Sequence, residues 1–270
     1  MTKLSSSRTA APPGRRIRSG IGLLACAAVL ASAATPPAQA ATIGFDNVSN
    51  IVTPALPADS PLYNGGDRFT TDRFLAVVAD SAFAQSFPDY EPGLAGAVVG
   101  AQQWSACTFL ACPFGETSYY AGVNDGSLTL SREDGSAFRL SALTYAGIGP
   151  ESEEGAAHSM GQLRLWGTTA AGSVITATAD LPELHAWADW TLDNAFAGTS
   201  LTSLRIDACA YTAAGACLND GTLLNASQFA VGTLSVSAVP EPSALAMLAG
   251  GLALLGAASR TRRLRNGGRA

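Results

Sequence analysis

Basic residues are scarce in the central part of the chain. Between residues 41 and 238 there is no lysine, and six arginines stand against twenty acidic residues, a formal net charge of −14. Such a surface repels phosphate backbones and anionic lipids, which argues against nucleic acid and against peripheral membrane binding. It favours cations and neutral ligands.

Histidine is also scarce, which limits the chemistry available for catalysis. The chain has two histidines, and nucleophilic catalysis needs a nucleophile, a base and a group that orients the base. His158 precedes Ser159 without a Gly-x-Ser-x-Gly motif, and His185 lies among aromatic residues in LPELHAWADW. Glycoside hydrolysis needs two opposed carboxylates, and no pair stands out among the acids. We therefore expect a non-enzymatic protein, with a secreted hydrolase acting on matrix glycans as the alternative.

The N-terminus has the pattern of a secretory signal peptide. A segment with several arginines precedes an apolar run over residues 21–34, and a small-x-small cleavage site follows at Ala38 and Ala40. We place the start of the mature chain at Ala41. A twin-arginine signal and a lipoprotein box ending at Cys26 remain as alternatives that fit the neighbouring residues less well.

The C-terminus has the pattern of a short membrane span. Residues 244–258 carry no charge, and five arginines follow within residues 260–269. Fifteen helical residues rise about 22 Å, less than the ~30 Å hydrocarbon core, so the span suits transient membrane insertion. The arginines predict a cytoplasmic C-terminal end, with the rest of the chain outside.

Three residues just before this apolar segment carry a family resemblance. Pro240, Glu241 and Pro242, followed by the apolar run and the arginine cluster, resemble the PEP-CTERM sorting signal. The resemblance implies a Gram-negative bacterium that makes exopolysaccharide. It also implies processing by signal peptidase and by the membrane protease exosortase, with passage through the inner membrane to the cell envelope or extracellular matrix. It covers about the last thirty residues and does not specify the activity of the rest.

Four cysteines remain once the signal peptide is removed: Cys107, Cys112, Cys209 and Cys217. Four cysteines allow three pairings, and an exported protein meets an oxidising compartment. The short separations favour two local disulfides, the first two cysteines together and the last two together. A metal site is the alternative, but no histidine lies near either pair.

Apolar residues in the central region recur two apart, which is strand periodicity. Examples are Leu128 with Leu130 and Leu163 with Leu165. Further strands are predicted at 43–48, 73–78, 98–104, 138–140, 174–179, 201–206 and 229–236. Asn-Asp-Gly and Glu-Asp-Gly sequences supply turns between them. The segment 71–84 is ambiguous between a helix and a strand.

Many short strands at roughly ten-residue spacing predict an all-β fold, and we expect a two-sheet β-sandwich of the jelly-roll type. The predicted organisation is a signal peptide over 1–40, this passenger domain over 41–238, and a sorting signal with a C-terminal apolar helix over 239–270. The layout is similar to that of secreted jelly-roll modules, including carbohydrate-binding ones, in which the first and last strands often neighbour each other.

Aromatic side chains are the candidates for sugar binding, because sugar rings stack on them while polar groups orient the hydroxyls. The candidates are Trp187 and Trp190 with Asp189 between them, and the pair Tyr119 and Tyr120. Adjacent residues of a strand face opposite sides, so one tyrosine of the pair is expected at the surface or at an edge. Trp104 and Trp166 lie inside apolar runs and are predicted to belong to the core.

The sequence offers one candidate for a bound cofactor, a structural calcium ion. Carboxylates on an extracellular domain suit calcium, although no Asp-x-Asp-x-Asp-Gly loop is present. Asp46 near the first strand and Asp207 near a late strand could hold one structural calcium ion if the terminal strands are neighbours.

Overall fold

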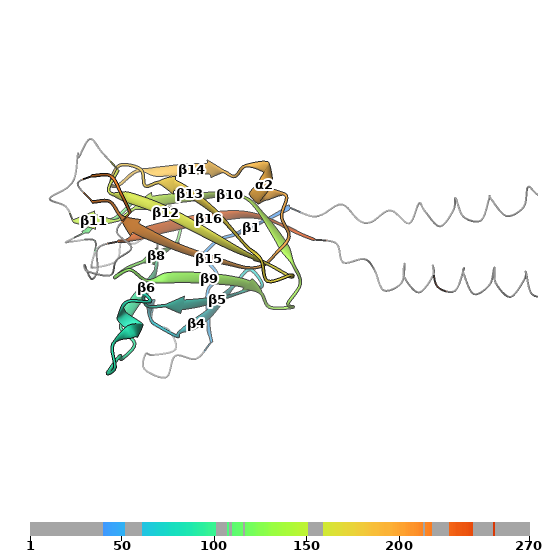
Figure 1. Ribbon diagram of the computed structural model, residues 1–270, viewed down its shortest axis with the longest axis horizontal. Coiled ribbons are helices and arrows are strands. Elements are labelled where there is room, and N and C mark those ends of the chain that lie inside the picture. The colour runs from blue at the N-terminus through green and yellow to red at the C-terminus, as the bar shows by residue number, and fades with distance from the viewer. Residues whose placement is uncertain are drawn as a thin grey trace, which may run out of the picture. The chain divides into compact units, whose positions relative to one another are not determined.

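A computed structural model gives the architecture of the central region (Figure 1). It describes residues 40–51, 61–100, 107, 110–115, 117–150, 159–212, 214–217, 227–239 and 251. The chain divides into two compact units, residues 37–241 and the two tails, 1–36 with 242–270. Apart from residue 251, all described residues belong to the first unit.

Several sequence predictions fall on residues outside this set. They include Trp104, which was predicted for the core, Ala38 of the signal peptidase site, Pro240, Glu241 and Pro242 of the sorting signal, and nearly all of the predicted span over 244–258. Among the residues that are described, no helix is both long and apolar enough to cross a membrane.

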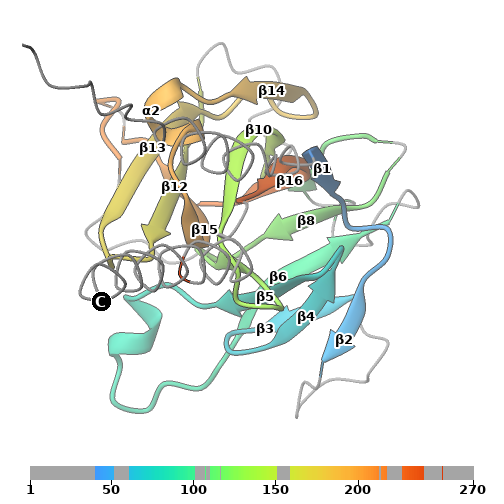
Figure 2. The same ribbon diagram turned by 90° about the vertical axis from the view of Figure 1, so that its right-hand side faces the viewer.

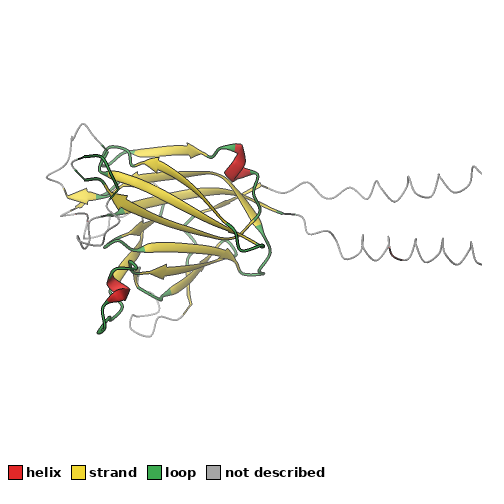
Figure 3. Ribbon diagram, in the orientation of Figure 1, coloured by secondary structure: helices red, strands yellow, loops and turns green. Residues whose placement is uncertain are grey.

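The described residues are dominated by strands, with two very short helices (Figure 3). The strands are β1 (Ala40–Ile43), β2 (Ser49–Ile51), β3 (Leu62–Asn64), β4 (Arg68–Thr71), β5 (Phe74–Ala79), β6 (Leu94–Val99), β7 (Leu110–Ala111), β8 (Tyr119–Gly122), β9 (Ser127–Arg132), β10 (Phe138–Gly147), β11 (Gly149–Pro150), β12 (Gly161–Thr169), β13 (Val174–Asp180), β14 (Trp187–Thr191), β15 (Leu201–Ala210) and β16 (Phe229–Ala238). The helices are η1 (Ala84–Ser86) and α2 (Asn194–Ala197).

Fourteen of these strands form one nearly closed antiparallel sheet, and β7 pairs only with β11. The sheet has two halves. The first runs β13-β12-β15-β9-β5-β4-β2, and the second runs β14-β10-β16-β8-β6-β3 with β1 beside β16. A single residue pair, Phe138 with Leu201, joins β10 to β15 and thereby links the halves. Figure 2 shows the strands from the end, with β12 and β13 on one side and β8 and β16 on the other.

The inner faces of the two halves share one apolar core. Phe74 on β5 meets Phe138 on β10 edge to face, with ring centroids 5.1 Å apart. Phe69 on β4 stacks near Tyr120 on β8, with centroids 6.2 Å apart. These contacts cross from one half to the other, so burial of aromatic and aliphatic side chains holds the halves together.

The all-β prediction is confirmed. The first and last strands are neighbours, as expected, because β1 pairs with β16 from Ala40–Ser237 to Ile43–Leu234. The middle of the ambiguous segment 71–84 is the strand β5, with the last residue of β4 at its start and the first residue of η1 at its end. The Asn124-Asp125 turn has φ values of 56° and 59°, the left-handed backbone that its sequence predicts.

Two predicted strands are misplaced. The strand expected at 43–48 ends at Ile43, because the Gly44 amide donates to Asp72 instead of to a neighbouring strand (2.8 Å). The strand expected at 98–104 overlaps β6, which begins at Leu94 and ends at Val99, while residues 101–104 of the prediction lie outside the described residues. An apolar run therefore predicts the presence of a strand more reliably than it predicts the residues at which that strand begins and ends.

Candidate functional site

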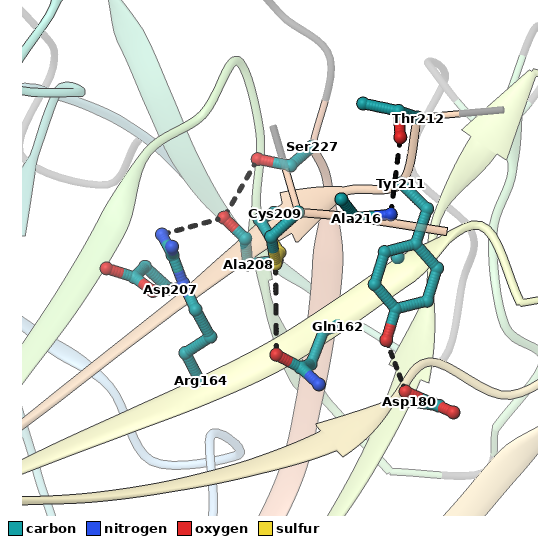
Figure 4. Close-up of a disulfide and its surroundings, with 12 residues drawn as sticks. Gln162, Arg164, Asp180, Asp207, Ala208, Cys209, Tyr211, Thr212, Ala216 and Ser227 are labelled. Carbon is teal, nitrogen blue, oxygen red and sulfur yellow. Dashed lines mark hydrogen bonds and ion pairs between the residues drawn. A yellow bond between two sulfur atoms is a disulfide. The ribbon is translucent and has the colours of Figure 1, made fainter. Parts of the chain in front are cut away.

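The two predicted disulfides are present. Cys107 pairs with Cys112 and Cys209 with Cys217, with Cα–Cα distances of 5.4 and 5.5 Å. The second bridge ties the end of β15 to the chain that follows it. It lies beside Gln162 of the neighbouring strand β12 (Figure 4).

Trp187 and Trp190 do not form the single aromatic platform that the sequence suggested. They stand three residues apart on β14, so they point to opposite faces of the sheet. Trp190 packs on the core beside Tyr145, with ring centroids 5.8 Å apart. Trp187 donates its indole N–H to the Phe114 carbonyl (2.8 Å) and meets Tyr119 edge to face. Asp189 is exposed on the same face as Trp187.

Tyr119 and Tyr120 are both buried, with exposed fractions of 3% and 0%, so the expectation of one surface tyrosine is wrong. They do point to opposite faces of β8, but both faces are covered. Tyr120 enters the main core, and Tyr119 enters a second apolar cluster against which Trp187 packs. Burial raises the pKa of Tyr119 to about 12 and that of Tyr120 further.

The aspartates suggested for calcium have separate protein partners. Asp46 accepts a hydrogen bond from the Ser118 amide (2.9 Å), which lowers the pKa of its carboxyl. Asp207 is paired with two arginines. Within the described residues no group of three or more His, Cys, Asp or Glu is placed to hold a metal ion. The calcium site stays a prediction, and the arginine partners of Asp207 count against it.

Trp166 occupies a surface position that the sequence analysis assigned to the core. On β12 the buried residues are Gly161, Leu163, Leu165 and Gly167, and the alternate residues are half-buried on the outer side. Trp166 belongs to the outer set, together with Gln162 and Arg164. The alternation in GQLRLWGT was the available signal, because a residue one step from Leu165 must face away from the core.

Asp207 holds the polar groups around this tryptophan in place. It lies on β15 opposite Arg164, and Trp166 lies opposite Arg205. Its Oδ1 atom accepts from Arg164 Nε at 2.7 Å and from Trp166 Nε1 at 3.2 Å, and its Oδ2 atom accepts from an Arg205 terminal nitrogen at 2.9 Å. The Asp207 side chain is only 4% exposed, so these charge-assisted bonds are shielded from water.

The same face continues toward the disulfide. Figure 4 shows Gln162 and Arg164 on one strand beside Asp207 and Cys209 on the next, with Tyr211 reaching Asp180 of β13. The Tyr211 hydroxyl donates to Asp180, which raises the pKa of Tyr211 to about 12. We call this surface the Trp166 face: Gln162, Arg164, Trp166, Asp180, Arg205, Asp207 and Tyr211.

A separate concave feature lies beside β6. A cavity of about 370 Å³ is lined by acidic and aromatic side chains that include Asp80, Phe87, Asp89, Tyr90 and Glu91. Asp80 is buried and accepts from the Tyr90 hydroxyl and from the Gly93 amide (3.2 Å). Burial and this bond raise the pKa of Tyr90 to about 12. We call this feature the Asp80 pocket.

Comparisons with known proteins identify the sorting signal. Residues 238–263 match the family model of the PEP-CTERM protein-sorting motif, so the resemblance of the C-terminus to that signal is confirmed. The motif marks an exported, envelope-targeted protein that is sorted by exosortase. A search of curated proteins gives no match.

Two solved structures are distantly similar to the chain. One is a DUF4465 family protein from Bacteroides ovatus, with 9% identity, a TM-score of 0.35, and coverage of 74% of this chain and 99% of that one. The other is TmCBM61 in complex with β-1,4-galactotriose, with 10% identity, a TM-score of 0.27, and coverage of 62% and 88%. Because both TM-scores are below 0.5, neither likeness supports an argument about this chain.

Proposed function

We propose that this exported protein resides in the cell envelope or extracellular matrix as a non-enzymatic β-sandwich that binds polysaccharide on the Trp166 face. The observation that carries the proposal is the outward position of Trp166, whose indole N–H is bonded to Asp207. A half-buried ring that is fixed in this way loses little conformational entropy when a ligand stacks on it.

The surroundings of Trp166 support sugar as the ligand. An aromatic ring supplies the stacking surface, and nearby guanidinium, amide and hydroxyl groups can bond sugar hydroxyls. Trp166 and Tyr211 place two aromatic rings on one face, and Gln162 and Arg164 lie on the same side of β12 as Trp166. From residue 162 to residue 168 the strand extends about 20 Å, so the face is long enough for several sugar units of an extended chain.

Binding of purified secreted protein to a panel of polysaccharides tests this function. We expect Trp166→Ala to reduce affinity about tenfold or more while the protein stays folded. Trp187→Ala is the matched control, because it removes an equally half-buried ring that packs on the second apolar cluster, and it should leave affinity unchanged. Equal binding by wild type and Trp166→Ala would refute the Trp166 face as the site.

A secreted glycan hydrolase is the second candidate function. The observation that favours it is that the Asp80 pocket brings Asp80, Asp89 and Glu91 to one cavity together with two aromatic side chains. Incubation of the same polysaccharides with the protein, followed by a reducing-end assay, separates the two functions. We expect retention without turnover. Release of reducing ends that is lost in Asp80→Asn would establish the hydrolase instead.

The final location has its own test. We propose that the secreted form begins near Ala41 and lacks the arginine-rich segment that follows residue 259. The intact mass of the protein from the culture medium or matrix measures both ends at once. A secreted form that retains the arginines would contradict processing of the tail.

A further inference from the structure

We infer that the Trp166 face selects acidic polysaccharides, with Arg205 binding the carboxylate of a uronic acid whose ring stacks on Trp166. This inference rests on the proposed function and adds the class of sugar to it. The two arginines that pair with Asp207, Arg164 and Arg205, have different roles, which follow from their geometry and exposure.

Arg205 has the position of a ligand-binding group. It lies directly across from Trp166 in the β12–β15 register, and cross-strand neighbours have Cβ atoms about 5 Å apart. A sugar ring that stacks on the indole therefore carries its substituents over the guanidinium. The Arg205 side chain is 48% exposed, and one of its terminal nitrogens is bonded to Asp207. The remaining donors of the planar fork can take a carboxylate in the bidentate geometry that arginine prefers.

Arg164 has the position of a supporting group. Its side chain is 19% exposed, and it donates to both Asp207 Oδ1 (2.7 Å) and the Ala208 carbonyl (3.3 Å). Its guanidinium also lies 5.8 Å from the centre of the Trp166 ring. Arg164 therefore fixes the tryptophan and the aspartate, whereas Arg205 faces the ligand.

The local charge favours an anion although the domain is acidic. Two guanidinium groups share the one carboxylate of Asp207, which gives these three residues a net charge of +1. The other acid of the Trp166 face, Asp180, lies opposite Gln162, four residues along β12 from Trp166. The −14 of the central region is spread over the whole chain from 41 to 238. At physiological ionic strength the Debye length is about 8 Å, so distant acids act weakly on a group held at Arg205. The acidic remainder of the surface opposes non-specific polyanion binding, which confines recognition to this cluster.

The test uses the purified secreted protein and two polymers with the same sugar backbone, polygalacturonate with free carboxylates and its fully methyl-esterified form with neutral esters. We expect wild type to bind the free acid about tenfold more tightly than the ester, with a preference that shrinks as salt is added. Arg205→Gln should remove the preference, and Arg205→Lys should keep part of it, because lysine retains the charge without the fork.

Arg132→Gln is the matched control, because Arg132, at the end of β9, is also paired with an aspartate, Asp134 in the turn that follows. It should leave the preference intact. Equal binding of both polymers by wild type would overturn acidic selection while leaving the proposed function standing. A preference that survives in Arg205→Gln would overturn the assignment to Arg205. Binding of neither polymer, together with no binding of any neutral polysaccharide, would remove the proposed function and this inference together.

Discussion

The Trp166 face and the outer face around Trp187 belong to the same antiparallel sheet but differ in the side chains that pack against each tryptophan. Both tryptophans lie on strands and donate their indole N–H to a protein oxygen, Trp166 to Asp207 and Trp187 to Phe114. Trp187 is packed against an apolar cluster that includes Tyr119 and Ala97, whereas Trp166 lies among polar and charged side chains. The difference indicates that the residues packed over a strand, more than the aromatic residue itself, decide whether its ring can meet a ligand.

Truncation of the two tryptophans should give the largest contrast in stability. We expect Trp187→Ala to lower the free energy of unfolding by about 3 kcal/mol, because it leaves a cavity beside Tyr119 and removes a hydrogen bond. Trp166→Ala should cost about 1 kcal/mol, because its ring, although half-buried like that of Trp187, lies among polar side chains and outside both apolar clusters. Thermal melting of both variants beside wild type measures the difference. Equal melting temperatures for the two variants would contradict the claim that Trp187 is packed into the fold more tightly than Trp166.

Removal of the second disulfide should have the next largest effect. The bridge between Cys209 and Cys217 closes a short loop, and loop-closure entropy predicts a loss of about 2.5 kcal/mol in the double serine variant. The loss should appear in chemical denaturation with the first bridge intact. Non-reducing peptide mapping supplies the control, and a peptide that joins Cys107 to Cys209 would contradict the pairing on which the estimate depends.

Substitution of Asp207 tests whether its bonds to Arg164, Trp166 and Arg205 keep these side chains in position for binding. Asp207→Asn removes the charge that two arginines share, and we expect a loss of about 2 kcal/mol of stability together with weaker glycan binding. Asp134→Asn is the control, because that carboxylate pairs with Arg132 at the open surface and should change neither property measurably. Full retention of binding in Asp207→Asn would show that Trp166 and Arg205 do not need this support.

The smallest effect concerns the far end of the Trp166 face. The bond to Asp180 raises the pKa of Tyr211 to about 12, whereas an unfolded tyrosine ionises near 10. Its contribution to stability is therefore present below about pH 10 and is lost as the pH rises through about 12. When the tyrosines are titrated by ultraviolet absorbance, the Tyr211→Phe variant should lack one ionisation near pH 12 that wild type shows. If the lost ionisation lies near pH 10, the bond to Asp180 is absent in solution.

The sequence predicted the strand content and both disulfides well, because each depends on local pattern. Leu163 and Leu165 show the core side of β12 through their spacing of two, and the short separations of the cysteines restrict pairing. The pairing of the first and last strands was expected from the resemblance to jelly-roll modules. The halves of the sheet and their one shared pair, Phe138 with Leu201, could not be read from local pattern, because they depend on contacts between distant segments.

The candidate site was predicted less well, for two different reasons. Tyr119 and Tyr120 were expected to divide between core and surface, which alternation alone supports, but a second apolar cluster covers the outer side of β8. Trp166 was assigned to the core because it lies inside an apolar run, although alternation in its own strand placed it outside. The first error concerns a covering contact that the sequence does not show, and the second concerns a periodicity that was present and should have outweighed hydrophobicity.

The central claim is that the Trp166 face, and not the face around Trp187, binds polysaccharide. The most direct test is the affinity of wild type, Trp166→Ala and Trp187→Ala for one bound polysaccharide, measured at a temperature where melting shows all three to be folded. We expect Trp166→Ala to lose about tenfold or more in affinity while Trp187→Ala binds like wild type. Loss of binding in Trp187→Ala with full binding in Trp166→Ala would contradict it.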